Sequence, residues 1–323
     1  MNVDFKVCVR CFTYNQSQYI IDTLDGFCMQ QTDFPFVCCI VDDASTDGTQ
    51  QVIRKYLEEY FDLKDDSNSY NSETSYAYIN LAKHKENHNC FFVVVLLKEN
   101  HYSNPSLNNK KNGYISQWRD KCIYEALCEG DDYWIDNSKL HKQVDYLEKH
   151  NDCGLVRTDV RAYYQSESVF ERKYMSKGVF AKNDDSELYY VVYGRFAAPC
   201  TWVYRMDIFN TLPQLDSNKY FVGDILYLLH FSHFSRIYYL KEETAVYRIL
   251  DESASHFKDI KTKYTFYLRN KRTRALYVKK KDFLTRMKFI VVNTFIVRPQ
   301  GSKSFTLWCR WAKDSMNDFW ELI

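Results

Sequence analysis

The stretch Cys128-Glu129-Gly130-Asp131-Asp132-Tyr133-Trp134 ends an apolar run with three carboxylates in four residues. The run before it, from Cys122, is typical of a mostly buried strand, and open α/β sheets hold their ligands at the ends of such strands. Glu129 and Asp131 lie two positions apart, so they point roughly the same way in extended chain. Two carboxylates held together repel, and Mg²⁺ or Mn²⁺ would satisfy them together with phosphate oxygens. The alternative is a turn whose acids cap the next helix.

The composition fits a globular protein better than a nucleic-acid binder. The 323 residues can bury a full core, and 43 Lys and Arg nearly balance 42 Asp and Glu, which leaves no basic field for nucleic acid. The one CxxC, Cys8 to Cys11, has no second CxxC to complete a zinc site. We therefore expect core cysteines in a reducing compartment, with a metal or redox role as the alternative.

The sequence shows no secretory signal and no membrane span. The N-terminus lacks a basic region followed by a long apolar core, and no run reaches the ~18 apolar residues of a spanning helix. We therefore expect a cytoplasmic protein.

Two strand–loop–helix units open the chain. β-favouring residues from Val3 to Phe12 lead through a polar break to a helical stripe that begins at Ile20. The apolar run 36–41 then stops at Asp42-Asp43, before a second helical stripe. Consecutive units of this kind predict right-handed crossovers and a mostly parallel sheet with its loops at one edge.

The rest of the first half is less regular. Residues 62–89 are polar and rich in Asn and Ser, with a weak helical patch at 76–81, and we expect an insertion there. Apolar residues 91–97 predict a third strand, and 115–119 part of a helix.

Beyond residue 160 the pattern weakens. Asp224 opens a helical run, and 236–240 with 244–249 suggest two paired strands. From residue 260 basic and aromatic residues alternate, which predicts a helical tail. This tail either lies on the inner membrane face or packs on the rest of the protein.

Polar side chains follow three strands at the points where they end. They are Thr13-Tyr14-Asn15, Asp42-Asp43 and Glu129-Gly130-Asp131-Asp132. The chain has no GxGxxG after the first strand and no GxxxxGK[ST], so a Gly-rich loop does not cradle phosphate. This favours a nucleotide held by side chains and a carboxylate-bound cation, while turn formation and helix capping remain the alternative for Asp42-Asp43.

On these motifs the sequence resembles a family 2 glycosyltransferase of the GT-A fold. The resemblance covers roughly residues 5 to 160, and the later pieces match more loosely. The matching pieces are Tyr14-Asn15 with Tyr19-Ile20, Gln31, Val41 to Thr49, Ala126 to Trp134 with Lys139-Leu140, then Gly223-Asp224 and Tyr247-Arg248 through Ser253 to His256.

The resemblance implies an α/β, Rossmann-like GT-A domain, a mixed and mostly parallel sheet flanked by helices, with a C-terminal helical extension. Residues 1–134 would form the nucleotide-sugar half, 135–259 the acceptor-side half, and 260–323 the tail. The implied activity is transfer of a sugar, with inversion, from a nucleotide-diphosphate sugar to an acceptor hydroxyl. A UDP-sugar is the expected donor and a glycan or lipid-linked glycan the expected acceptor, in surface polysaccharide synthesis.

The resemblance also implies residue roles. Thr13, Tyr14, Asn15, Asp42, Asp43, Glu129 and Gly130 would bind the nucleotide, with Tyr14 beside the base and Asp43 accepting its imide proton. Asp131 would bind Mn²⁺ or Mg²⁺, His256 would complete the metal or diphosphate site, and Asp224 would be the catalytic base. Asp132, Tyr133, Trp134 and Arg248 would line the donor or acceptor pocket.

Four of these roles have alternatives. Glu129 replaces the first Asp of the family's Asp-x-Asp motif, so it binds either ribose or metal. Asp224 also fits a helix cap, His256 a structural hydrogen bond, and Arg248 either a phosphate contact or a surface charge.

Two rival functions stay open. A sugar-phosphate nucleotidyltransferase would need a Gly-rich basic loop after the first strand, which residues 12–16 lack. A non-catalytic glycan- or nucleotide-binding scaffold of the same fold is the other.

Overall fold

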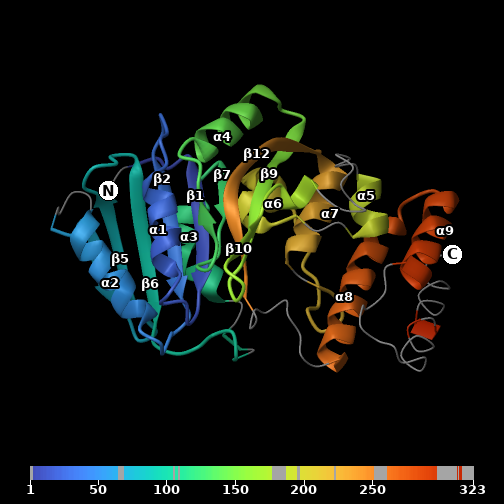
Figure 1. Ribbon diagram of the computed structural model, residues 1–323, viewed down its shortest axis with the longest axis horizontal. Coiled ribbons are helices and arrows are strands. Elements are labelled where there is room, and N and C mark those ends of the chain that lie inside the picture. The colour runs from blue at the N-terminus through green and yellow to red at the C-terminus, as the bar shows by residue number, and fades with distance from the viewer. Residues whose placement is uncertain are drawn as a thin grey trace.

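One mixed sheet of 12 strands runs through the molecule, with helices on both of its faces (Figure 1). The computed structural model describes residues 3–64, 69–104, 106–107, 110–176, 187–194, 197–221, 223–250, 260–296, 311 and 313–314. In these ranges the predicted α/β class is confirmed.

Strands and helices alternate regularly only as far as α2. The strands are β1 (Val7–Thr13), β2 (Phe36–Asp42), β3 (Phe61–Asp62), β4 (Tyr70–Glu73), β5 (Ala77–His84), β6 (Cys90–Leu97), β7 (Tyr124–Leu127), β8 (Tyr133–Trp134), β9 (Cys153–Tyr164), β10 (Val169–Glu171), β11 (Val203–Arg205) and β12 (Arg236–Ile249). The α-helices are α1 (Ile20–Cys28), α2 (Thr49–Tyr60), α3 (Lys111–Arg119), α4 (Lys139–Lys149), α5 (Glu187–Tyr193), α6 (Met206–Phe209), α7 (Asp224–Phe234), α8 (Ile260–Val278) and α9 (Phe283–Val291).

The order of the strands brings three predicted loops to one edge. The neighbours run β3-β5-β6-β2-β1-β7-β11-β9-β12-β8, and β6, β2, β1 and β7 are parallel. Thr13 pairs with Asp42, so the loops that leave β1 and β2 start side by side. We call the side where these four strands end the carboxyl edge.

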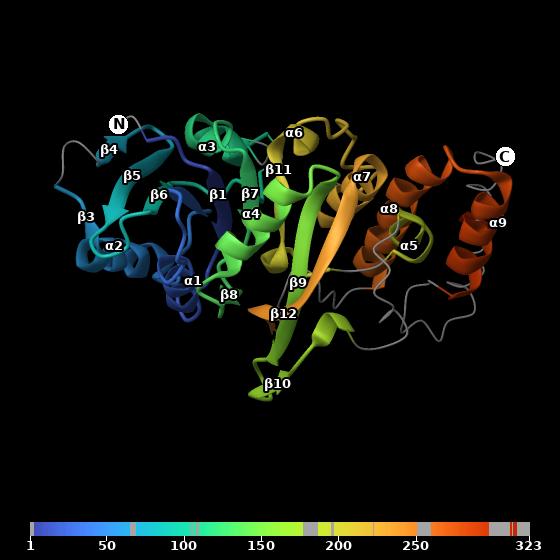
Figure 2. The same ribbon diagram turned by 90° about the horizontal axis from the view of Figure 1, so that it is seen from above.

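Buried side chains cover both faces of the central strands. Every residue of β2 is buried, because α1, α2 and α4 pack on one face of the sheet and α3 on the other (Figure 2). A continuous apolar run is what a parallel strand between two helical layers requires. The described cysteines are free, and Cys8 and Cys11 are buried in β1, as expected of core residues.

The predicted helical patch at residues 76–81 is wrong. This segment belongs to β5, which pairs antiparallel with β6. Ala77, Ile79 and Leu81 are buried while the residues between them are partly exposed. This period of two marks a strand with one buried face and one face toward solvent. The strands β3, β4 and β5 therefore extend the sheet beyond β6.

The predicted pair of strands near residue 240 is also wrong. Residues 236–240 and 244–249 are the two ends of β12, which pairs parallel with β9 throughout. The register shifts between Leu240 and Glu243 and between Glu243 and Ala245. Lys241, Glu242 and Glu243 lie at this irregularity, between the two predicted strands.

The direction of β12 places the start of α7. Strands β7, β11 and β9 alternate antiparallel and β12 is parallel to β9, so β12 points the same way as β1. Because α7 ends at Phe234, just before β12 begins, its first residue Asp224 lies toward the carboxyl edge.

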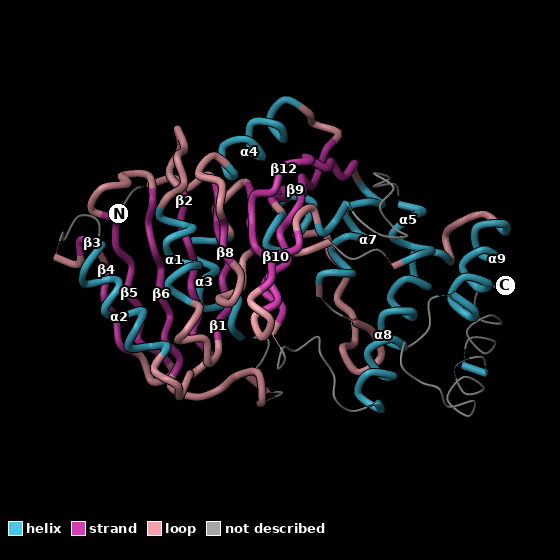
Figure 3. The backbone as a smooth tube through the Cα atoms, viewed as in Figure 1, coloured by secondary structure: helices cyan, strands magenta, loops and turns pink. Residues whose placement is uncertain are grey.

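The described part of the tail is helical, as predicted. Helices α5, α7, α8 and α9 gather beyond β9 and β12 (Figure 3) and share a core that includes Leu229, Tyr277 and Phe289. The tail therefore packs on the sheet domain. Among the described helices, none is both long and apolar enough to cross a bilayer.

Candidate active site

The turn after β7 is held against β1 by its backbone. Gly130 N donates to Phe12 O over 3.0 Å, and the Thr23 hydroxyl lies 2.7 Å from Asp132 O. A Cβ at Gly130 would stand 2.6 Å from Thr13 Oγ1 and 2.5 Å from Gln16 Oε1. Only glycine therefore lets the turn approach the loop after β1 this closely.

Glu129 and Asp131 are the acids with the fewest protein partners in this turn. Phe12 N donates to the accessible Glu129 carboxylate over 3.2 Å. Loss of surrounding water, with the nearby charge of Asp131, raises the pKa of Glu129 to about 7. Burial also raises the pKa of Asp131, whose carboxylate accepts no side-chain hydrogen bond within the described ranges. Arg10 and Lys111 act on Glu129 and Arg248 on Asp131, yet in both groups burial raises the pKa more than these cations lower it.

These two carboxylates suit a hard divalent cation whose remaining ligands come from a substrate. No group of three or more His, Cys, Asp and Glu in the described part of the chain is placed to hold a metal. Mg²⁺ and Mn²⁺ accept one or two carboxylates and take their remaining ligands from water and phosphate. His256, the other predicted metal ligand, lies outside the described residues.

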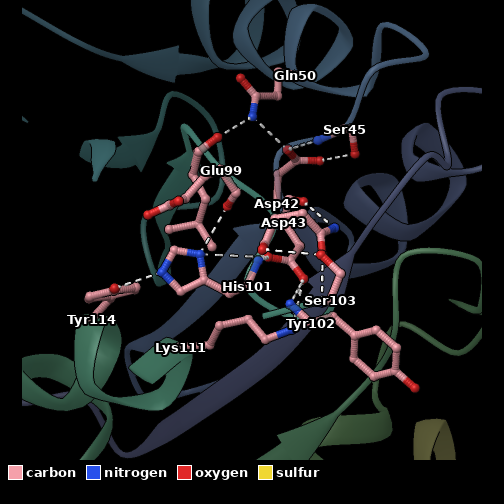
Figure 4. A network of polar contacts seen from close by, with 12 residues as sticks. Asp42, Asp43, Ser45, Gln50, Glu99, His101, Tyr102, Ser103, Lys111 and Tyr114 are labelled. Carbon is pink, nitrogen blue, oxygen red and sulfur yellow. Dashed lines mark hydrogen bonds and ion pairs between the residues drawn. The ribbon is translucent and has the colours of Figure 1, made fainter. Parts of the chain in front are cut away.

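Asp43 is buried under the loop that follows β6 (Figure 4). Its Oδ1 accepts from His101 N over 2.7 Å, and its Oδ2 accepts from Tyr102 N and Lys111 Nζ, both over 3.0 Å. Only 4% of its side chain is exposed. Asp43 therefore anchors the loop from 99 to 104, and a ligand would have to share its carboxylate with these donors.

Asp42 and Asn15 shape the loops on either side of Tyr14. Asp42 accepts from Ser45 N over 2.9 Å and from Gln50 Nε2 over 2.7 Å, as a turn former does, and burial raises its pKa. Asn15 has a φ of 53° and accepts from Thr46 N over 2.8 Å, which ties the loop after β1 to the loop after β2. The Tyr14 side chain is 48% exposed and open to a ligand.

Two residues predicted to line a pocket are buried structural residues instead. Trp134 packs against Phe27, and its Nε1 donates to Cys200 O over 2.9 Å. Asp132 accepts from Arg248 N over 2.8 Å, which joins the turn to β12. Tyr133, between them, is half-buried.

Arg248 is neither a surface charge nor a free phosphate ligand. It is 6% exposed, and its guanidinium donates to Asp131 O over 2.8 Å and to Asp22 over 2.7 Å. The same group lies 4.7 Å from the centre of the Tyr19 ring. Arg248 therefore orients Asp131 through its backbone.

Asp224 is half-buried at the start of α7, on the side of the carboxyl edge. Gly223 occupies the cap position, and the Asp224 carboxylate accepts only from Ile225 N, over 2.8 Å, among the described residues. Within the described residues it does not accept from an N–H two or three positions further along the helix, as a capping side chain would. Burial raises its pKa.

Lys111 was missed from the sequence because the polar segment 99–113 shows no periodicity. Its ammonium is bonded to Asp43 and is close enough to lower the pKa of Glu129, which puts the two acidic loops on one site. A second missed feature lies below, where Glu125 contacts Arg119 over 2.5 Å and Arg10 over 3.2 Å. The sequence does place a charged residue in each of two apolar strands, Arg10 in β1 and Glu125 in β7, and buried charges need partners, so this pair could have been predicted.

The match to known sequences begins in β1. Residues 9–94 match the model of glycosyl transferase family 2. An uncharacterised protein of Mycobacterium tuberculosis is 34% identical over 153 residues, which are 47% of this chain and 34% of that protein. An uncharacterised glycosyltransferase of Mycoplasma pneumoniae is 25% identical over 73% of this chain and 64% of its own length. The chain thus spans about a third to two thirds of these relatives.

The fold is similar to that of a solved structure. Residues 1–349 of S. aureus TarS, solved with UDP-GlcNAc, align with a TM-score of 0.61 at 18% identity, over 99% of this chain and 82% of that one. The fold is therefore of the GT-A type, a mixed sheet flanked by helices with a helical C-terminal region.

Proposed function

We propose, from the match of residues 9–94 to glycosyl transferase family 2, that this chain transfers a sugar from a nucleotide-diphosphate sugar to an acceptor hydroxyl with inversion at the anomeric carbon. The observation that carries the proposal is the pairing of Glu129 and Asp131 at the carboxyl edge, beside the open Tyr14. Acids with few protein partners suit a cation-bound diphosphate, and an exposed aromatic ring beside them suits a nucleobase.

In this proposal the nucleotide lies across the loops after β1, β2 and β6. The exposed ring of Tyr14 stacks on the base. Asp43 Oδ1 accepts a single hydrogen bond among the described residues, so it has capacity for the imide proton. Thr13, Asn15 and Gly130 shape the floor of the site rather than carrying charge.

Glu129 and Asp131 would hold Mn²⁺ or Mg²⁺ together with the diphosphate. When bound, this cation supplies Lewis-acid stabilisation of negative charge on the departing nucleoside diphosphate. Lys111 adds a positive charge beside Glu129. Arg248 positions Asp131 and makes no contact with the substrate.

Asp224 would act as the base. Its carboxylate takes the proton of the acceptor hydroxyl as that oxygen bonds to the anomeric carbon, while the bond from that carbon to the phosphate oxygen breaks on the opposite face. A single displacement of this kind inverts the anomeric configuration. A base so placed contributes typically about 10²–10⁴-fold to the rate.

The biological role that we propose is cytoplasmic synthesis of a surface polysaccharide, on a glycan or lipid-linked glycan acceptor. TarS was solved with UDP-GlcNAc, so UDP-sugars are the first donors to test.

The test is release of UDP from UDP-sugars with Mn²⁺, measured for the wild type, Asp224→Asn and Asp207→Asn. Asp207 is a matched control because it is exposed at the start of α6 and accepts from the next backbone N–H over 2.8 Å, as Asp224 does. Asp224→Asn should keep donor affinity and lose about 10²-fold or more in turnover. Near wild-type turnover would refute the base assignment, and binding of no nucleotide would favour the scaffold.

A further inference from the structure

The corner between α8 and α9 presents large apolar side chains to water. Phe283 is 61% exposed and Leu284 77%, and Phe234, the last residue of α7, is 60% exposed. Three lysines, at 279 to 281, precede the two α9 residues with Asp282 between them. We define the corner patch as Phe234, Lys279, Lys280, Lys281, Phe283 and Leu284.

Contacts join the two parts of the patch into one surface. Glu187 of α5 accepts from His233 Nδ1 over 2.6 Å and also from Lys281 Nζ. The Phe234 ring lies 4.7 Å from the ring of His233. The end of α7 therefore lies beside the turn that leads into α9.

The start of α9 is fixed in place. Asp282 caps the helix, accepting from Thr285 N over 3.0 Å and from Thr285 Oγ1 over 2.7 Å. Phe289 anchors the following turn in the core shared by α7 and α8. Phe283 and Leu284 cannot turn inward without breaking this cap, so their exposure is built into the helix.

Charge decides which partner suits this surface. Lys281 and His233 donate to Glu187, and Asp282 caps α9, so both of these acids already have partners. Lys279 and Lys280 remain exposed beside the apolar side chains. Lysine is depleted in protein–protein interfaces but favourable beside anionic lipid.

We propose that the corner patch docks the protein on a bilayer with anionic headgroups. Phe283, Leu284 and Phe234 enter the interface between headgroups and acyl chains, and Lys279 and Lys280 contact lipid phosphates. The occupant is a lipid surface rather than a second copy of this chain.

Docking there sets the orientation of the site. Phe234 and Asp224 are the two ends of α7, about 16 Å apart along an 11-residue helix. The carboxyl edge then faces water, away from the bilayer. On the proposed transferase function, this favours an acceptor hydroxyl on a glycan that extends from the membrane.

The test is co-sedimentation of the full chain with phosphatidylcholine vesicles, with and without about a third of phosphatidylglycerol, at ~0.1 M salt. The wild type should bind only the anionic vesicles. Lys279→Gln with Lys280→Gln should weaken partitioning about 30-fold, and Leu284→Ser about 10-fold or more. Lys149→Gln and Val169→Ser are matched controls, exposed on α4 and β10, and should bind as the wild type does.

Equal binding to both kinds of vesicle, or wild-type binding by the patch variants, would overturn the proposal. Self-association without lipid that Leu284→Ser abolishes would also overturn it, in favour of a second copy of the chain. Vesicle binding is measured without nucleotide, so its failure is distinct from failure of the transferase proposal.

Discussion

Replacing Asp43 with Asn tests whether this residue anchors the loop after β6. The wild-type carboxylate accepts from His101 N, Tyr102 N and Lys111 Nζ while almost fully buried. An amide keeps one acceptor oxygen and replaces the other with a donor. The amide oxygen should stay toward Tyr102 and Lys111, which leaves the new NH₂ group facing His101 N.

The structure gives the size of the effect. Asp43→Asn loses one hydrogen bond to a charged group, worth about 1.5–3 kcal/mol, and the Lys111 ammonium, 12% exposed, loses its counter-charge. We expect the free energy of unfolding to fall by about 3 kcal/mol. Lys111→Met leaves both backbone donors satisfied and should cost less, about 1–2 kcal/mol.

The assay combines urea unfolding with hydrogen exchange at the amides of His101 and Tyr102. Exchange there should accelerate strongly in Asp43→Asn and only slightly in Lys111→Met. Asp33→Asn is the control, because its pairing with His141 is exposed and should contribute less than about 1 kcal/mol. Wild-type protection of both amides in Asp43→Asn would refute the anchor role and leave Asp43 free for the nucleotide.

Three further predictions concern the same half of the protein. Gly130→Ala should abolish donor binding in a nucleotide titration, because the new Cβ would clash with Thr13 and Gln16. Gly113→Ala in α3 is the control: its Cβ meets nothing within 4 Å, and it should stabilise the fold by about 0.5–1 kcal/mol. Normal donor binding by Gly130→Ala would contradict the close approach of the turn to the loop after β1. Burial lowers the pKa of Lys139 from 10.5 to about 8. Below pH 8 the lysine is charged in both the folded and the unfolded state, so the folded state carries the full cost of burying the charge. Between pH 8 and 10.5 the lysine is charged only in the unfolded state. The unfolding free energy of the wild type, relative to Lys139→Met, should therefore rise by about 3 kcal/mol over that range, and a difference that does not change with pH would refute this. Burial raises the pKa of Asp224, so turnover should decline with falling pH at a higher pH than an ordinary aspartate would give, and an acidic limb at or below pH 3.8 would exclude it as the base.

Local pattern was enough to predict the centre of the sheet. Strands β1, β2 and β6 are apolar runs that stop at polar loops, and the parallel connection of such strands brings Thr13 next to Asp42. The loop after β7 joined them at the same edge because β7 pairs with β1.

Long-range contacts decided what the sequence could not predict. Lys111 meets Asp43 across 68 positions, and nothing in the segment 99–113 marks that pairing. Trp134 looked like a pocket residue because it follows the acids, yet alternation in β8 turns it into the core. The prediction divided β12 into two strands at its charged centre. What keeps it one strand is pairing with β9, which lies about 80 residues earlier and cannot be seen in the local pattern.

The most direct test of the account is calorimetric titration of UDP into the protein with and without Mn²⁺. The acids at the end of β7 are predicted to bind the diphosphate only through a cation, so the wild type should bind UDP tightly with Mn²⁺ and weakly without it. Asp131→Asn should lose the metal-dependent part, and Asp33→Asn should keep it. Equal affinity with and without Mn²⁺, or an unchanged metal effect in Asp131→Asn, would contradict the account.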